Sequence, residues 1–307
     1  MIIKDYSVSQ EVFTLVYDSV LELYRTNPVP DELGKYYESE AYISHTDSRK
    51  TLFDRLYQWV KSYNLKHKIA LIKQYKKGNI HLLDIGAGTG DFVLSSKKYA
   101  HWEAMGIEPS ENARAKAEEK GLLLQADFGN LLPHSFDVIT MWHVLEHVPD
   151  VTQEIQIISK LLKKDGVAVI AVPNYRSWDA QHYKEHWAAY DVPRHLWHFS
   201  KKSIEQLFAK EGFQLLATHP MLFDAFYVSM LSEQYKTGKK SFLKGFLNGL
   251  RSNYYGWRKG AYSSQIYILG KKYEIRGKTY LFLIFLKLKI AKTSNKAFLQ
   301  HFSLINN

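Results

Sequence analysis

Cysteine is absent from the 307 residues of this chain. Disulfide bonds, thiolate metal sites and cysteine nucleophiles are therefore excluded. Long apolar runs are missing as well, since no stretch reaches the roughly 18 apolar residues that a membrane-spanning helix needs. The opening segment, MIIKDYSVSQ, has no apolar run of the kind found in secretory signals. We therefore expect a cytoplasmic protein.

Charge is unevenly distributed along the chain. The net charge is +10, and eight Lys or Arg residues with one Glu lie between Lys271 and Asn307, so the preceding 270 residues carry only +3. A charge confined to one tail argues against nucleic acid as the partner of a catalytic domain. The hydrophobic share of 46% and the charged share of 23% are those of a globular protein with a sizeable core.

The most informative stretch is HLLDIGAGTGDF, residues 81–92. A short apolar strand leads into three alternate glycines, Gly86, Gly88 and Gly90, and then into a predicted helix. Glycine is needed where the backbone takes a positive φ or approaches a ligand closely, and a helix N-terminus offers free N–H groups. The pattern predicts a turn that holds a nucleotide-like ligand.

A second apolar strand ends in Glu108, 24 residues after Asp84. A carboxylate at that position is suited to accept hydrogen bonds from both hydroxyls of a ribose. A dinucleotide fingerprint has the spacing G-x-G-x-x-G, but here the third glycine comes one residue early and Asp91 stands in its place. The spacing therefore argues against a dinucleotide.

The D-x-G-x-G-x-G form, with Asp84 leading, resembles motif I of the class I S-adenosylmethionine (SAM) methyltransferases. In that family the acidic motif residue lies near the cationic end of the cofactor. After the third predicted strand, Asp127 is placed to accept from an exocyclic amine, and Phe128 to lie against the purine. The resemblance implies SAM as cofactor, held by Asp84, Gly86, Ala87, Gly88, Gly90, Glu108, Pro109, Asp127, Phe128 and Met141.

The stretch FDVITMWHVLEHVPD follows, and its LEHVPD resembles the corresponding loop of ubiquinone-biosynthesis and related small-molecule methyltransferases. Within it, His143, Glu146 and His147 also spell H-x-x-E-H, the pattern of an inverted zinc protease. That site needs a long helix, whereas this stretch follows a strand and meets Pro149. We therefore predict no metal site, and His143 is the first candidate for a general base.

An aromatic segment, residues 174–200, follows the fifth predicted strand. The family resemblance places such a segment over the methyl group as a substrate lid. On this interpretation Arg194 contacts an anionic or polar group of the substrate, and His195 is the second candidate base. The alternative is that Asp191 and Arg194 pair to hold the loop while the aromatic side chains pack.

Three regions follow from these patterns. Residues 1–47 form an N-terminal extension. Its T-x-P-x-P…YY motif resembles that of methyltransferases that carry a small zinc ribbon, but Tyr17 and Val20 occupy the positions of the cysteines in that group. The alternatives are a β-hairpin held by packing alone or a helical or irregular cap. Residues 48–272 form the methyltransferase domain, with a helical insertion at 221–260. Residues 273–307 form a basic tail, and either the insertion or the tail is a candidate for peripheral membrane contact.

The predicted fold is an α/β, Rossmann-like, mostly parallel seven-stranded sheet with helices on both faces. The predicted function is methyl transfer from SAM to a small molecule, as an O-methyl transfer to a sugar, quinone-like or lipid-linked metabolite. The alternatives are a SAM-binding regulatory or scaffold module without turnover and a nucleic-acid methyltransferase that uses the basic tail; a homodimer is left open. Predicted strands lie near 81–85, 103–107, 122–125, 136–141, 167–172 and 261–270, and predicted helices near 48–76, 90–99, 110–120, 151–163 and 201–211.

Overall fold

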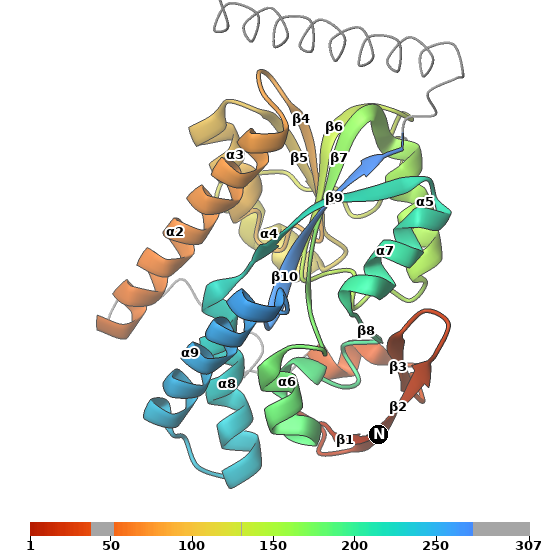
Figure 1. Ribbon diagram of the computed structural model, residues 1–307. Coiled ribbons are helices and arrows are strands. Elements are labelled where there is room, and N and C mark those ends of the chain that lie inside the picture. Colours follow the sequence, from red (N-terminus) through yellow and green to blue (C-terminus); the bar gives the residue numbers. More distant parts are fainter. Residues whose placement is uncertain (38–51, 130, 273–307) are drawn as a thin grey trace, which may run out of the picture. The chain divides into compact units, whose positions relative to one another are not determined.

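The computed structural model describes residues 1–37, 52–129 and 131–272 (Figure 1). Residues 1–271 form one compact unit, and residues 272–307 belong to a second. The predictions for the tail, and part of those for the N-terminal extension, therefore lie outside the described residues. For residues 52–59 only the backbone is described.

A six-stranded sheet forms the centre of the described chain, in the order β5-β4-β6-β7-β10-β9. The first four strands in this order run parallel, whereas β10 is antiparallel to both of its neighbours. The chain leaves β4 toward β5 on one side and later leaves β6 toward β7 on the other, so the order switches between β4 and β6. Ligands bind at such a switch point, at the carboxyl ends of the strands. The strands are β4 (His81–Ile85), β5 (Glu103–Ile107), β6 (Phe136–Trp142), β7 (Leu162–Pro173), β9 (Phe213–Pro220) and β10 (Ser264–Lys271).

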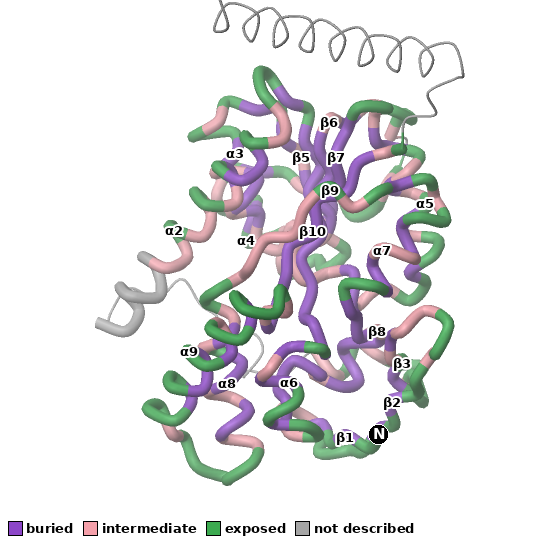
Figure 2. The backbone as a smooth tube through the Cα atoms, viewed as in Figure 1, coloured by how far each residue is buried: buried purple, intermediate pink, exposed green. Residues whose placement is uncertain are grey.

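Helices cover both faces of this sheet because the side chains of each strand alternate between two cores (Figure 2). In β4, Leu82 packs into the core under α2, α3 and α4, and Leu83 packs into the opposite core under α5 and α7. All of these strand residues are buried. The helices are α2 (Leu52–Tyr75), α3 (Asp91–Ala100), α4 (Glu111–Glu118), α5 (Val151–Leu161) and α7 (Lys201–Lys210).

The predicted Rossmann-like sheet is confirmed, but its strand list needs two corrections. The strand predicted at 122–125 is reduced to a single bridge between Ile107 and Gln125. Leu123 in this segment is 80% exposed, so only one residue pair holds it against the edge of the sheet. In contrast, β9 was not predicted from the sequence, because its polar residues Gln214, Thr218 and His219 mask the strand pattern.

The N-terminal residues form a second, four-stranded sheet in the order β1-β2-β3-β8. The strands are β1 (Ile2–Lys4), β2 (Val12–Asp18), β3 (Leu23–Asn27) and β8 (Trp197–His198). Of the two alternatives for this segment, the structure has the hairpin, formed by antiparallel β2 and β3. Tyr17 and Val20 are exposed near its turn. A relation to a zinc ribbon stays a prediction.

Segment 174–200 packs beneath this sheet. It contains α6 (Trp178–Tyr183), the 3-10 helices η2 (Lys184–His186) and η3 (Ala188–Tyr190), and β8, which pairs with β3. Its aromatic side chains Tyr183, Trp187 and Tyr190 form a third hydrophobic core with residues of β1 and β2. The segment is thus a packed layer rather than a loose lid.

Arg194 ties this layer to the N-terminal sheet. Its side chain is fully buried and its terminal nitrogen lies 3.0 Å from Asp5 Oδ1 and 2.7 Å from Asp191 Oδ1. It also donates to the Ser7 hydroxyl and to the carbonyl oxygen of Tyr36. Burial opposes ionisation of Asp5, but hydrogen bonds from Arg194 and Ser9 outweigh it and lower the pKa of Asp5 to about 2.

Between β9 and β10 the chain forms a helical hairpin of α8 (Leu222–Thr237) and α9 (Phe242–Lys259), as the prediction of a helical insertion indicates (Figure 1). Three glycine and serine residues on the buried side of α9, Gly245, Gly249 and Ser252, allow it to pack closely on its neighbours. Among the described helices, none combines the length and the apolar character needed to cross a membrane.

We predict that Arg194→Met lowers the free energy of unfolding by about 3–5 kcal/mol, because it leaves the buried Asp5 carboxylate without its cationic partner. The matched control is Arg25→Met, which removes a half-exposed pair with Asp18 and should cost at most about 1 kcal/mol. Urea unfolding of both variants measures the difference. Equal losses in the two variants would contradict the structural role of Arg194.

Candidate functional site

The glycine turn lies at the carboxyl end of β4, beside the switch point of the sheet. Gly86, Gly88 and Gly90 have φ values of 69°, 55° and 76°, in the left-handed region that favours glycine. The turn is fixed to the neighbouring strand by the Ala87 amide, which donates to the Ile107 carbonyl oxygen at 2.9 Å. A Cβ at Gly86 would lie only 2.4 Å from the Val144 side chain, so any other residue here would have to displace Val144.

Glu108 joins the turn to the end of β5. Its Oε2 accepts from the Gly88 amide at 2.8 Å, and its Oε1 accepts from the Ser110 amide at 2.9 Å. Each carboxylate oxygen has a second lone pair, so the group can still accept from two further donors. The contact of Glu108 with the ribose hydroxyls stays a prediction, and the geometry leaves lone pairs for it.

An acidic and a basic side chain, Asp84 and Lys68, lie close to the glycine turn. Asp84 is buried and accepts from the Thr140 hydroxyl at 2.5 Å. Burial raises the pKa of Asp84 to about 7, against the hydrogen bond from Thr140 and the charge of Lys68. Burial also lowers the pKa of Lys68 to about 8, although Asp84 and Asp224 favour its charged form. The Lys68 ammonium lies 4.1 Å from the centre of the Trp142 ring.

A cavity of about 330 Å³ opens between the turn and α2. It brings together four residues of the predicted cofactor site, Asp84, Gly86, Ala87 and Gly88. Sequence reasoning missed the wall that α2 provides, because nothing in the motif indicates which upstream helix closes over it. The residues of that wall are Val60, Lys61, Asn64, Leu65 and Lys68.

The remaining predicted cofactor residues lie outside the lining of this cavity. Gly90 caps α3 and packs against Leu122, and Pro109 is exposed after β5. Asp127 is exposed and accepts from the Gly129 amide at 2.7 Å, while Phe128 packs partly against the core.

Met141 needs a correction. Its side chain is fully buried in the core and does not line the cavity, so a cofactor contact through that side chain is not supported. The next residue, Trp142, lines the cavity instead. Neighbouring strand residues point to opposite faces of a sheet, so an error of one position exchanges a core residue for a cavity residue.

A second cavity, of about 200 Å³, shares Asn64 and Lys68 with the first. Its other walls come from α2, the end of β9 and the start of α8, and they carry both apolar and polar groups. His219 is one of these and lies 2.6 Å from the Tyr75 hydroxyl, and burial together with the nearby His67 lowers its pKa. The other lining residues are Tyr63, His67, Pro220, Met221, Leu222, Phe223, Asp224 and Ile266.

His143, the first candidate base, is held between two carboxylates. Its Nδ1 lies 3.2 Å from Glu146 Oε1 and its Nε2 lies 2.9 Å from Asp224 Oδ2. Burial disfavours the charged ring, but Asp224 and Glu146 outweigh it and raise the pKa of His143 to about 10. An imidazolium cannot accept a proton, so the geometry makes His143 a link to α8 rather than a base.

Arg194 and His195 lie away from both cavities. The buried ion pairs of Arg194 favour the alternative in which Asp191 and Arg194 hold the loop, which corrects the expectation that Arg194 contacts a substrate. The His195 ring lies beside that of His147, with ring centres 4.6 Å apart. Among the described residues, segment 174–200 contributes nothing to the lining of the two cavities.

The parallel sheet, its switch point and the glycine turn with Glu108 define an α/β protein that binds a nucleoside-containing cofactor. Residues 56–218 match the methyltransferase domain family. This match covers more than half of the chain, and the chain therefore belongs to that family. The predictions of a class I methyltransferase and of SAM as its cofactor are thereby confirmed.

Curated relatives match only a part of the chain. It is 38% identical over 107 residues to the ubiquinone biosynthesis O-methyltransferase of Actinobacillus pleuropneumoniae serotype 5b, a match that covers 30% of this chain and 45% of that protein. It is 36% identical over 94 residues to the enzyme of the same description from Vibrio cholerae serotype O1, covering 28% of this chain and 38% of that protein. The matches span less than half the length of these relatives.

The chain is also similar to solved structures. The PH0226 protein from Pyrococcus horikoshii OT3 superposes with a TM-score of 0.50 at 14% identity, covering 78% of this chain and 99% of that chain. The phosphoethanolamine N-methyltransferase 2 of Haemonchus contortus, in complex with SAM, has a TM-score of 0.47 at 18% identity, covering 68% of this chain and 53% of that chain.

We predict that Gly86→Ala weakens SAM binding by about tenfold or more, which corresponds to 1.4 kcal/mol, because the new methyl group displaces Val144 at the cavity. Gly121→Ala is the matched control, since Gly121 has a similar φ of 77° but open space around its Cβ. Calorimetric titration with SAM measures both variants. An unchanged affinity for a folded Gly86→Ala protein would remove the turn from the cofactor site.

We also predict that SAM binds more tightly as the pH rises from 6 to 8. Because the pKa of Asp84 is raised to about 7, the carboxyl is mostly neutral at pH 6 and mostly ionised at pH 8, and only the ionised form attracts a cationic cofactor. The ionised fraction, and with it the affinity, rises about tenfold over this range.

Asp84→Asn is the control for this pH dependence. SAM has titrating groups of its own, and their effect on the affinity remains in the variant, whereas the effect of the Asp84 carboxyl is removed. The rise centred near pH 7 should disappear in this variant. A wild-type affinity that falls with pH would contradict the assignment of Asp84.

Proposed function

We propose that the chain transfers the methyl group of SAM to a hydroxyl of a small, partly apolar acceptor. The observation that carries this proposal is the pair of adjoining cavities, which share Asn64 and Lys68. One is formed by the glycine turn and suits the cofactor, and the other is large enough for a compact ring or sugar. Methyl transfer requires the two reactants in line and in contact, which adjoining cavities provide.

The cofactor residues follow the geometry of the turn. Asp84 faces the cationic end of SAM, Gly86, Ala87 and Gly88 let the backbone approach it, and Glu108 receives the ribose hydroxyls. Asp127 and Phe128 extend the site toward the adenine. SAM is an activated donor, so alignment and exclusion of water are the main contributions of the protein.

A hydroxyl acceptor must also lose a proton, and Lys68 is the proposed base. It lines both cavities, so it lies at their junction, where the methyl group passes. Its pKa is already lowered to about 8 by burial, and a cationic cofactor nearby lowers it further. The neutral amine then accepts the proton of the acceptor hydroxyl. His143 and His195, the two bases predicted from the sequence, take second place, because one is charged and the other lies outside the cavities.

The acceptor class follows from the surroundings of the second cavity. Leu222 and Phe223 line that cavity and are themselves substantially exposed at the start of α8. The exposed apolar surface continues along α9, where Trp257 is 74% and Phe242 68% exposed. The relatives named ubiquinone biosynthesis O-methyltransferases add support for an oxygen acceptor of quinone-like or lipid-linked type.

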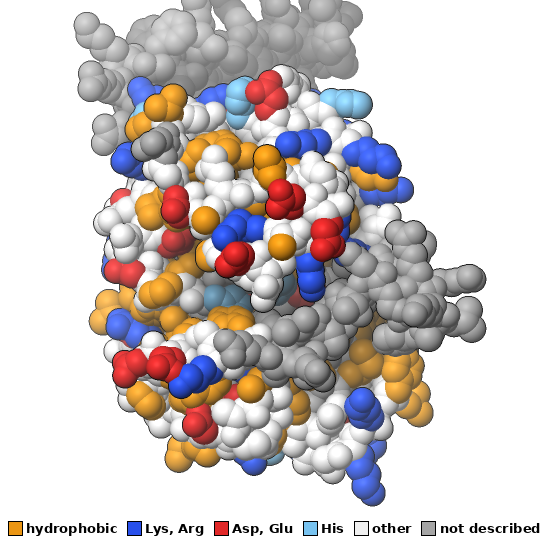
Figure 3. Space-filling view, turned by 180° about the vertical axis from the view of Figure 1, so that it is seen from behind, with side chains coloured by type: hydrophobic (Ala, Val, Ile, Leu, Met, Phe, Trp, Pro, Cys, Tyr) orange, Lys and Arg blue, Asp and Glu red, His pale blue; other side chains and the backbone are white. Residues whose placement is uncertain are grey.

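Basic residues accompany this apolar surface. Seven Lys or Arg residues and no Asp or Glu lie between Lys236 and Lys259. In Figure 3, hydrophobic side chains and basic side chains lie together at the lower right, where the α8 and α9 hairpin is placed in that view. An apolar face with aromatic residues and a basic border is typical of a surface that binds anionic lipid. We therefore propose that the hairpin brings the acceptor cavity to a membrane surface.

The proposed activity is tested by incubating the purified chain with methyl-labelled SAM and separate panels of quinone precursors, sugar nucleotides, lipid extracts and nucleic acids. We expect label in a methyl ether of a hydroxylated quinone precursor or lipid. Tight SAM binding without transfer to any panel would favour a scaffold module, and label confined to nucleic acid would contradict the small-molecule assignment.

We predict that Lys68→Met lowers kcat by about 100-fold or more, the usual contribution of a general base. The pH profile of kcat should show an apparent pKa at or below about 8 in the wild-type enzyme and become flat in the variant. Lys66→Met, at an exposed position two residues away on the same helix, is the matched control. A Lys68→Met enzyme that keeps the wild-type pH profile would remove Lys68 from proton transfer.

We predict that the chain binds vesicles of phosphatidylcholine with phosphatidylserine, but not vesicles of phosphatidylcholine alone, and that binding weakens with salt. Trp257→Ser should weaken this binding severalfold, whereas Leu123→Ser, at an 80% exposed position elsewhere, should not. Co-sedimentation measures it. Equal binding by both variants, or dimerisation through the hairpin without vesicle binding, would contradict a lipid-facing surface.

A further inference from the structure

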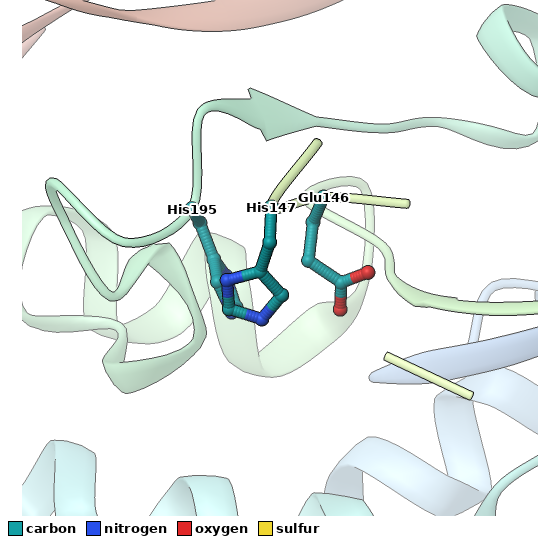
Figure 4. Close-up of side chains that lie close together, drawn as sticks. All are labelled: Glu146, His147 and His195. Atoms are coloured by element: carbon teal, nitrogen blue, oxygen red, sulfur yellow. The ribbon is translucent and has the colours of Figure 1, made fainter. Parts of the chain in front are cut away.

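Three side chains with metal-binding atoms lie close together where the loop after β6 meets segment 174–200. Glu146 and His147 lie in the loop after β6, and His195 lies just before β8. Each offers one ligand atom, and the three atoms lie within 4.8 Å of one another. Figure 4 shows the side chains projecting alongside each other from these two segments. They lie outside the lining of both cavities described above.

Both imidazole rings are oriented by main-chain carbonyl groups. His147 Nδ1 lies 3.0 Å from the Arg194 carbonyl oxygen, and His195 Nδ1 lies 2.9 Å from the Ala189 carbonyl oxygen. The Tyr37 hydroxyl also lies 3.0 Å from His147 Nδ1, and it can accept from that nitrogen while it donates to the Arg194 carbonyl oxygen at 3.3 Å. Because a carbonyl oxygen can only accept, we assign the proton to Nδ1 of each ring, which leaves a lone pair on each Nε2. Histidines that bind metals are held in this way, with the second nitrogen donating to a carbonyl or carboxylate.

Glu146 supplies the third lone pair. Its side chain is 1% exposed, and Oε1 is engaged by His143. In the described part of the chain, Oε2 is buried without any hydrogen-bond partner. An unpaired carboxylate oxygen is costly in a buried position, and a bound cation would remove that cost.

The backbone around the three residues is fixed. The Glu146 carbonyl oxygen accepts from the Leu196 amide at 2.8 Å and from the Trp197 amide at 3.2 Å, so the two segments are joined directly beside the cluster. The nearest further carboxylate, Asp191, is 3.9 Å from His195 Nε2, too far for a hydrogen bond, and it is paired with Arg194. The lone pair of His195 is therefore left for another ligand.

We propose that Glu146, His147 and His195 bind a divalent first-row transition-metal ion. Two imidazole nitrogens and one carboxylate oxygen suit Zn²⁺, Fe²⁺ or Co²⁺ and leave coordination positions open, whereas Mg²⁺ and Ca²⁺ prefer oxygen ligands alone. His147 is partly accessible, whereas His195 is buried at 9% exposure, so the ion would enter from the side of His147.

The sequence predicts no metal because H-x-x-E-H, with His143 as a ligand, needs a helix. The structure instead turns His143 toward Glu146 and Asp224 and brings in His195, which is 48 residues from His147 in the sequence. The proposed site is connected to the second cavity through Glu146, His143 and Asp224, because Asp224 lines that cavity. Occupancy of the site would therefore stabilise the position of α8 over the acceptor.

The test is titration of the metal-free full chain with Co²⁺, followed by visible absorption, with Zn²⁺ as competitor. We expect one equivalent of Co²⁺ to give d–d bands that Zn²⁺ removes. His147→Gln, His195→Gln and the near-isosteric Glu146→Gln should each weaken Co²⁺ binding by more than about tenfold. His101→Gln, at an exposed residue directly after α3, should leave Co²⁺ binding unchanged and serves as the control for a surface histidine.

Thermal unfolding with and without Zn²⁺ provides a second readout. Zn²⁺ should raise the Tm of the wild-type chain and of His101→Gln, but not of the three ligand variants. No Co²⁺ band and no Tm shift in the wild-type chain would overturn the proposal, and so would binding that survives in all three folded variants. These readouts do not depend on methyl transfer, so they stand or fall separately from the proposed function.

Discussion

The hydrogen bond from the Gly88 amide to the Glu108 carboxylate is the contact on which the site depends. It joins the turn after β4 to the end of β5, and the Ala87 amide reinforces the junction through Ile107. Because all three glycines have positive φ, the backbone can curve away from the sheet and leave the first cavity open. The carboxylate that organises the turn also keeps lone pairs free, so in the proposed function folding and ribose binding use the same group.

The rest of the chain closes this site from one side. The helix α2 contributes Lys68 to the first cavity, and α8 contributes Asp224, which is held by His143, to the adjoining second cavity. The aromatic segment 174–200 packs with the N-terminal sheet in a core of its own. This core and the buried ion pairs of Arg194 fix the loop that carries His195. Segment 174–200 thus holds residues beside the central sheet and does not line either cavity among the described residues.

Much of the sheet was predictable because local signals were strong. The bounds predicted for β4 and β5 agree with the structure, since each is a short, mostly buried segment followed by glycine or by polar and proline residues. The segment 122–125 has the same composition but lies at an edge, where a single bridge replaces a strand. The error at Met141 has a similar origin, because the end of a buried strand gives no periodic signal that separates it from Trp142.

The features that the sequence could not predict are tertiary. Aromatic residues in 174–200 are equally compatible with a lid and with a core, and only the pairing of β8 with β3 decides between them. Lys68 stands on a helix far from any motif, and its lowered pKa exists only when it is buried over Asp84. The same holds for His195, whose approach to His147 and Glu146 requires the folded loop.

We propose that SAM lies in the first cavity and that its ribose reaches Glu108, which adjoins this cavity through Gly88. A crystal structure of the chain with S-adenosylhomocysteine, the demethylated product, would show whether it does. We expect ribose hydroxyls within hydrogen-bond distance of Glu108, with the amino-acid end of the ligand between Asp84 and Lys68. A ligand bound elsewhere, or bound in this cavity with its ribose away from Glu108, would contradict it.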